Sequence, residues 1–278
     1  MTTLTKDTTS TLSAQGNQQK TMPFLAQVSM MSWRSIVTLA RTPAAVLPSL
    51  FISGFFLFIY EATLGNAADS IPGLSSGGYL AFILPLSIIS ASLSGAGVAG
   101  QNLVRDIENG YFDKLLLTPI SRSALLLGQI IAGAMVLLLQ TLIILGVGLL
   151  MGLDSATGVG GYLVVIAFSV ILGTGFAGFS VGVALRTNSA AATQGAGFIF
   201  FPLTFLTATF VPVDLLGGWL KTAAQLNPIT YILEAMRSVL LTGWDSEKLL
   251  TGVLACVVIG GIPFLYSLTS LRARTRRK

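Results

Sequence analysis

The sequence of 278 residues contains no histidine and a single cysteine, Cys256. One cysteine excludes an internal disulfide and any metal site built from several cysteines. The absence of histidine removes the commonest metal ligand and the commonest general base, so a histidine-dependent catalytic set cannot form. No lysine completes the glycine-rich loop pattern that cradles nucleotide phosphates. We therefore expect a chain that is neither an enzyme nor a nucleotide-binding subunit.

Charged residues are also scarce, at 10% of the chain, whereas hydrophobic residues make up 53% and the mean hydropathy is +0.80. A soluble domain carries roughly 25% charged residues. This small number of charges cannot cover a water-facing surface. Lipid must therefore be the solvent for much of the chain. The composition predicts an all-α polytopic membrane protein.

Six apolar stretches are long enough to cross roughly 30 Å of hydrocarbon. They lie at about residues 44–64, 79–100, 123–151, 161–185, 189–211 and 249–271. Residues 1–43 are predicted to form a cytoplasmic N-terminal tail and an interfacial segment, 44–271 the six-span transmembrane domain, and 272–278 a basic cytoplasmic tail. Glycine pairs in the spans, such as Gly178 and Gly182, favour close packing of helices within one chain over a seam between two chains.

The distribution of basic residues orients these spans. With both termini in the cytoplasm, 13 of the 16 lysines and arginines fall on the cytoplasmic side and 3 outside, as the positive-inside rule requires. The net charge of +5 therefore indicates lipid headgroups at the cytoplasmic surface and no nucleic acid.

Residues 101–123, between the second and third spans, combine charges with a helical pattern. Apolar residues recur there at a spacing of four, at Leu103, Ile107, Tyr111 and Leu115. This spacing predicts a short amphipathic helix along the cytoplasmic interface. Asn109 and Gly110 should interrupt or turn it, Pro119 should end it, and Ser121 or Ser123 should cap the next span. The pattern alone leaves open whether this is a connecting loop or a docking element for a cytoplasmic partner.

Residues 212–248, between the fifth and sixth spans, are too polar and broken for a span. Asn227 and Pro228 separate two apolar pieces whose lengths fit re-entrant or interfacial helices. In the second piece Glu234 and Arg237 lie three apart on one face and can pair. Trp219 fits an aromatic belt at the outer interface. The segment can be a gate or a structural plug that orders the outer rim, and the two roles are compatible.

Four motifs occur in order along this six-span frame. They are the loop pattern from Asp106 and Glu108 through Gly110, Leu115, Leu116, Thr118 and Pro119 to Ser121 and Arg122; Gly128-Gln129; Pro202-Leu203-Thr204-Phe205-Leu206 followed by Phe210-Val211-Pro212; and Asn227-Pro228-Ile229-Thr230-Tyr231. With this order and spacing, residues from about 24 to 271 resemble the membrane subunit of type-2 ABC exporters. That permease family includes daunorubicin-resistance and polysaccharide-export permeases.

The resemblance implies an amphipathic coupling helix after span two that fits a groove in a separate ATPase subunit. The residues that match it are Asp106, Ile107, Glu108, Asn109, Gly110, Tyr111, Phe112, Asp113 and Lys114. We expect their charges to lie in water, without a role in stability, and Tyr111 and Phe112 to be aromatic anchors in the groove. The resemblance also implies short re-entrant helices near the exit, which include Trp219, Asn227, Pro228, Glu234 and Arg237.

The same resemblance implies the assembly and its setting. Two ATPase subunits bind ATP and Mg, this chain holds no cofactor, and a second permease subunit, identical or related, completes the pathway. The complex is expected in the plasma (inner) membrane of a prokaryote, in contact with membrane lipids.

The expected function is ATP-driven export of amphiphilic drug-like or lipid-like substrates from the cytoplasm or the inner leaflet. An apolar pathway would be lined by the second and fifth spans, and the candidate lining residues are Phe198, Phe200, Phe201, Phe205 and Phe210. Export of polysaccharides or lipid-linked glycans is the alternative. An ion-coupled secondary carrier is disfavoured because the middles of the spans are almost free of charge.

Overall fold

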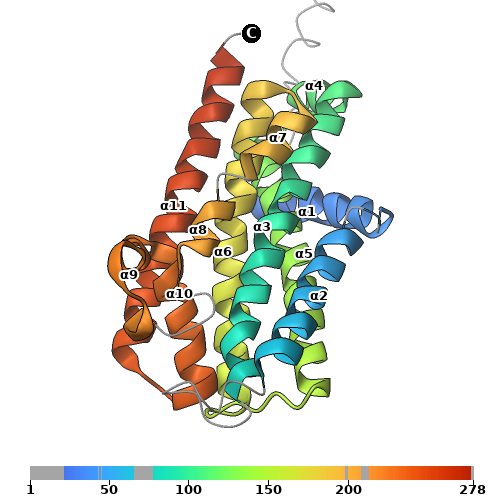
Figure 1. The fold of residues 1–278 in the computed structure, drawn as a ribbon. Coiled ribbons are helices and arrows are strands. Elements are labelled where there is room, and N and C mark those ends of the chain that lie inside the picture. Colours follow the sequence, from blue (N-terminus) through green and yellow to red (C-terminus); the bar gives the residue numbers. More distant parts are fainter. Residues whose placement is uncertain are drawn as a thin grey trace, which may run out of the picture.

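The computed structural model describes residues 22–42, 44, 46–65, 78–197, 200–207 and 213–276. Every regular element in these residues is a helix (Figure 1). Five of the described helices are long and apolar enough to cross a membrane. They are α2 (Leu47–Leu64), α3 (Gly78–Glu108), α5 (Arg122–Leu150), α6 (Val159–Thr187) and α11 (Ser246–Arg276). The predicted fold class, an all-α polytopic membrane protein, is confirmed.

The predicted fifth span is the one that the described residues do not show as a single long helix. They contain α7 (Ala190–Gly197) and α8 (Phe201–Phe205) instead. Residues 198, 199 and 208–211 of the predicted span lie outside the described residues. Pro202 stands in the first turn of α8, where its missing N–H costs no helical hydrogen bond. The count of six spans therefore stays a prediction.

The long helices form a bundle in which α6 packs against α3, α5 and α11. Small residues allow the closest contacts. A Cβ atom on Gly175 of α6 would stand 2.4 Å from the Cα atom of Gly260 on α11, and one on Gly182 would stand 2.6 Å from the ring of Tyr266. The two helix backbones approach each other only because these positions lack side chains. The expected packing within one chain is thus confirmed for Gly182.

Helix α1 (Phe24–Ala40) lies across the long helices and packs against α5 (Figure 1). It is amphipathic, because Val28, Ser32 and Ser35 are buried whereas Leu25 and Trp33 are exposed. This helix falls in the segment that the sequence predicts to be interfacial.

The two ends of the bundle carry different short helices (Figure 1). One end, called the α4 end below, holds α4 (Tyr111–Leu116), α7 and the C-terminal part of α11. Toward the opposite end, called the far end, lie η3 (Val213–Leu215), α9 (Gly218–Leu226), α10 (Pro228–Arg237) and the π-helical turn η4 (Ser238–Thr242). The two short helices expected on either side of Asn227 and Pro228 are present as α9 and α10.

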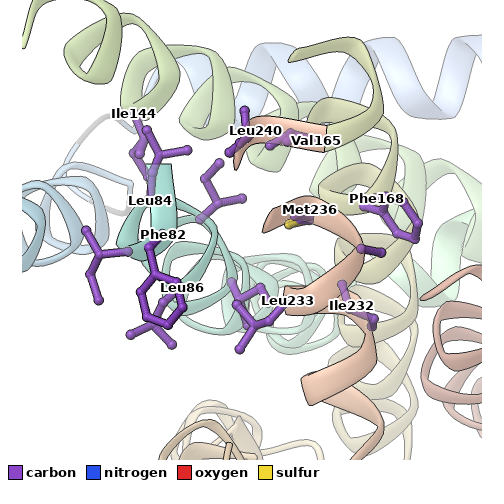
Figure 2. Close-up of a cluster of buried hydrophobic side chains, with 14 of the residues drawn as sticks. Phe82, Leu84, Leu86, Ile144, Val165, Phe168, Ile232, Leu233, Met236 and Leu240 are labelled. Carbon is purple, nitrogen blue, oxygen red and sulfur yellow. The ribbon is translucent and has the colours of Figure 1, made fainter. Parts of the chain in front are cut away.

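The largest group of buried apolar side chains lies where α10 meets α3 and α6 (Figure 2). Ile232, Leu233 and Met236 of α10 are fully buried there, with Phe82 of α3 and Phe168 of α6. α10 is therefore part of the core of the bundle, and the short helices at the far end are not a loose external loop.

Candidate functional site

The corner between α3 and α5 is built by local sequence signals. Gly110 ends the long helix in the left-handed region, with φ 68°, where a residue without a side chain is favoured. The chain then forms α4, and the Thr118 hydroxyl donates to the Leu115 carbonyl at 2.6 Å. Ser121 caps α5, since its Oγ accepts from the Ala124 N–H at 3.3 Å. The predicted turn at Asn109-Gly110 and the cap at Ser121 are confirmed.

An ion pair ties this corner to α1. The Arg34 guanidinium donates to both carboxylate oxygens of Asp106, with Nη2–Oδ1 at 2.6 Å and Nη1–Oδ2 at 3.0 Å. Gln129 of α5 donates from Nε2 to Asp106 Oδ2 at 3.2 Å, and the Arg34 guanidinium lies 4.0 Å from the centre of the Tyr111 ring. These four side chains, called the corner network below, join α1, α3, α4 and α5. Bidentate geometry makes such a pair directional as well as attractive.

The environment of Arg34 favours its charged form. Burial of the guanidinium opposes the charge, but the hydrogen bond and the negative charge of Asp106 outweigh burial and raise the pKa of Arg34. The side chains of Arg34 and Asp106 are 30% and 16% exposed, respectively. The pair is therefore neither freely solvated nor fully enclosed, and the guanidinium of Arg34 stays charged at any physiological pH.

Two expectations for this corner are wrong. Asp106 does not project into water, because it belongs to the corner network. Phe112 is not a free anchor, because only 2% of its surface is exposed and it packs with Leu103, Leu126 and Ala184 in the core of the bundle. Its neighbour Tyr111 is 36% exposed. α4 packs against α3, so one face of α4 must be buried. Phe112 and Leu115 occupy that face.

The remaining residues of the corner present a mixed surface to the outside. Glu108, Asn109, Tyr111 and Lys114 are exposed, whereas Ile107, Gly110 and Asp113 are partly buried. Leu117, which the sequence analysis did not select, is 88% exposed. The signal for it is the run of three leucines at 115–117, of which a helix can bury only those on one face. This exposed surface, made of Glu108, Asn109, Tyr111, Lys114 and Leu117, is called the α4 knob below.

The far end has a second set of polar contacts. Asn227 is buried and caps α10, because its Oδ1 accepts from the Ile229 N–H at 3.0 Å. Its Nδ2 donates to the Leu203 carbonyl of α8 at 2.5 Å and to the Leu206 carbonyl at 3.2 Å. Asn227 thus fixes the start of α10 to α8 and to Leu206, which follows it. These residues, 201–206, are called the α8 segment below. Trp219, on α9, is 75% exposed, as an interfacial tryptophan should be.

Arg237 ends α10, the second of the two short helices, as the sequence predicts, but its side chain is buried. It is only 6% exposed, its Nε donates to the Phe82 carbonyl of α3 at 2.8 Å, and its guanidinium lies 3.4 Å from the centre of the Phe82 ring. Glu234, three residues earlier, is partly buried on the same helix. The end of α10 is thereby bonded to α3.

The predicted pathway phenylalanines are described only in part. Phe205 is 50% exposed on α8, and Phe200 packs against Phe176 and Phe179, with ring centres 4.7 and 5.2 Å apart. Phe198, Phe210 and the side chain of Phe201 lie outside the described residues. A pathway role for these residues stays a prediction.

The described residues hold no group of three or more cysteine, aspartate and glutamate side chains that could bind a metal ion.

Comparison with known families assigns the chain. The model of the ABC-2 type transporter family matches residues 26–241, which include the corner network, Asn227 and Arg237. The chain belongs to the ABC-2 type transporter family. Members of this family are transmembrane permease subunits of ABC transporters.

Individual relatives of this ABC-2 chain carry related names. The chain is 28% identical to the probable doxorubicin resistance ABC transporter permease protein DrrC of Mycobacterium tuberculosis. The alignment of 228 residues covers 82% of each chain. The chain is 28% identical over 248 residues to the daunorubicin resistance ABC transporter permease protein DrrB1 of Streptomyces coeruleorubidus, covering 85% of this chain and 82% of that one. The probable multidrug ABC transporter permease YbhR of Escherichia coli is 25% identical over 170 residues, 59% of this chain and 44% of its own.

Proposed function

We propose that this permease subunit exports amphiphilic, drug-like molecules and that a separate ATPase drives it by pushing on the α4 knob. The observation that carries the proposal is the corner network. It fixes α4, with exposed Tyr111 and Lys114, to the ends of α3 and α5, and Glu108 is exposed in the last turn of α3. A rigid, charged projection is what a soluble motor needs to move helices that are surrounded by lipid.

In this proposal the α4 end faces the cytoplasm. Basic residues gather at that end, in the terminal turns of the long helices and in α4; they are Arg105, Lys114, Arg122, Arg186 and Arg272. The positive-inside rule assigns such an end to the cytoplasm. α1 then lies along the inner surface of a prokaryotic plasma membrane, with Trp33 and Leu25 exposed toward lipid.

The proposed substrate class rests on two supports. Relatives of the chain are named for doxorubicin, daunorubicin and multidrug transport. Phe205 also exposes an aromatic surface on α8, which suits a ring-bearing amphiphile better than a free sugar or an ion.

The working complex is proposed to hold two permease chains and two ATPase chains. α2 and α11 expose long apolar faces that include Phe51, Phe55, Val257 and Ile262. Lipid and a second permease are the two partners available to such faces in a membrane. Mass measurement of the purified complex in detergent tests this stoichiometry, and a transport-active complex with one permease chain would contradict it.

The test of function uses inside-out vesicles that contain the chain and its co-expressed ATPase. Uptake of doxorubicin, followed by its fluorescence, is expected only with ATP and only when both subunits are present. The matched control carries an ATPase that binds ATP but does not hydrolyse it. Uptake driven by a proton gradient without ATP would identify a secondary carrier, and uptake of glycans without any response to amphiphiles would refute the substrate class.

A further inference from the structure

Arg237 is an almost fully buried cation that bonds to a backbone carbonyl. Its Nε donates to the Phe82 carbonyl at 2.8 Å, and the guanidinium covers the Phe82 ring at 3.4 Å. Only 6% of its surface is exposed. Burying a charge is costly unless specific contacts replace water. The contact to α3 offsets part of this cost, together with the negative charge of Glu234 on α10.

Pro85 lies three residues after Phe82, inside the same helix. Proline has no N–H, so the carbonyl of Ala81 loses its helical donor, and the proline ring crowds the preceding turn, to which Phe82 belongs. Arg237 donates to the Phe82 carbonyl, which is next to the carbonyl that Pro85 leaves without a helical donor. The contact therefore joins the end of α10 to α3 beside the proline.

The other end of α10 is fixed to a different segment. Asn227 donates to the carbonyls of Leu203 and Leu206, the first of which lies in α8. Between Asn227 and Arg237, the apolar side chains of Ile232, Leu233 and Met236 are buried toward α3 and α6 (Figure 2). α10 therefore acts as a short strut that is bonded at one end to the α8 segment and at the other to α3.

α3 itself reaches the opposite end of the bundle. It runs without interruption from Gly78 to Glu108 and carries Asp106 of the corner network in its last turn. A displacement of the α4 knob must move the end of α3, and the hydrogen-bond ladder between Asp106 and Pro85 passes such a displacement along the helix axis. The ladder is interrupted at Pro85, and Arg237 bonds to α3 at that point.

We propose that Arg237 is a positioning residue that couples α10 and the α8 segment to α3, so that movement started at the α4 knob reaches the far end. This inference rests on the proposed function, because it takes the knob to be driven by an ATPase. It assigns the far-end helices an active part in each transport cycle, in place of a passive plug.

The first experiment compares Arg237→Met with Arg237→Lys in vesicles that contain the ATPase. Methionine fills the buried site without charge or donor. Lysine keeps a charge and a donor, but it lacks the planar guanidinium that can donate to the Phe82 carbonyl and stack on the Phe82 ring at the same time. With methionine we expect transport to fall about tenfold, within the usual range of coupling between sites, while ATP hydrolysis stays near the wild-type rate. Lysine should be intermediate. Normal transport in Arg237→Met would overturn the proposal.

A structural role is separated from a coupling role by Pro85→Ala. Alanine returns a donor to the Ala81 carbonyl and removes the ring that crowds the turn containing Phe82, so the double variant Pro85→Ala with Arg237→Met should regain thermal stability that the single Arg237→Met variant loses. If Arg237 couples the two helices, transport by the double variant stays low. Recovery of both stability and transport would show that Arg237 contributes stability alone, and would overturn the proposal.

A direct measurement of movement distinguishes failure of this inference from failure of the proposed function. Cys256 is buried, and Leu226, next to Asn227, is 79% exposed. In a Cys256→Ser background, the maleimide reactivity of Leu226→Cys is measured with and without ATP. We expect ATP to change the reactivity in the otherwise wild-type complex and to leave it unchanged with Arg237→Met. No change in the wild-type complex would count against ATPase-driven motion itself, whereas an equal change in both would refute the role of Arg237 alone.

Discussion

Exchange of Asp106 for asparagine removes the charge at the centre of the corner network and keeps the shape of the side chain. A hydrogen bond to a charged group contributes about 1.5–3 kcal/mol, whereas an exposed ion pair contributes about 0–1 kcal/mol. The pair of Arg34 and Asp106 is bidentate, and its side chains are 30% and 16% exposed. Allowing for this partial solvent screening, we expect a loss of about 2 kcal/mol. For a chain of this size that loss lowers the melting temperature by about 4–8 °C.

The assay measures the melting temperature in detergent, and then ATP hydrolysis and doxorubicin uptake with the ATPase. Asp106→Asn should leave ATP hydrolysis largely intact and lower uptake, because the α4 knob is no longer fixed to α1. The charge exchange Arg34→Asp with Asp106→Arg should regain part of both losses. Gln129 helps this exchange, since its buried Oε1 has no partner among the described atoms and can accept from the new arginine. Stability and uptake equal to wild type in Asp106→Asn would refute the reasoning.

Three further predictions concern single residues of the two ends. Tyr111→Ala should lower uptake with little loss of stability, whereas the neighbouring Phe112→Ala should cost about 3–5 kcal/mol because its ring is buried; equal melting temperatures of the two variants would contradict this. Gly110→Ala should cost about 1 kcal/mol through its φ of 68° alone, because no atom lies within 4 Å of the added Cβ; Gly110→Asn, which tolerates this conformation, is the control and should melt closer to wild type. Asn227→Ala should lose about 1 kcal/mol of stability with the cap, and more because the Leu203 and Leu206 carbonyls lose a donor. Asn227→Asp keeps the cap and loses only the donors. If Asn227→Asp melted like the wild type, the contacts to Leu203 and Leu206 would contribute nothing to stability.

Much of the architecture follows from hydropathy alone. Five of the six predicted spans match long helices, because each contains a run of apolar residues with few charges. The sequence ends the second span near residue 100, whereas α3 continues to Glu108. The reason is that Arg105 and Asp106 mark the limit of the hydrocarbon but do not break a helix. Gly110, which does, lies several residues later.

The site was less predictable, because its contacts join residues distant in sequence. Period-four spacing identifies an amphipathic helix near Tyr111 but does not tell which face is buried, since the direction of α4 depends on the turn at Gly110. The sequence predicts Asp106 to be a solvated charge. In the structure α1 brings Arg34, 72 residues away in sequence, within hydrogen-bonding distance of it. The acceptor of Arg237 is a backbone carbonyl 155 residues away, and no side-chain pattern identifies such a partner.

α3 is thus bonded near each end by an arginine from another helix, and the chemistry of each contact suits its surroundings. At the α4 end Arg34 remains partly exposed, so a carboxylate is the favourable partner and water screens the remaining charge. At the far end Arg237 is buried, and it contacts an uncharged carbonyl and an aromatic face of α3, which stabilise a cation without placing an anion on that helix. The first contact should weaken with salt, because exposed charges are screened over about 8 Å at physiological ionic strength. The second is shielded from ions by the surrounding core. High salt should therefore loosen the α4 end of α3 while its far end stays attached.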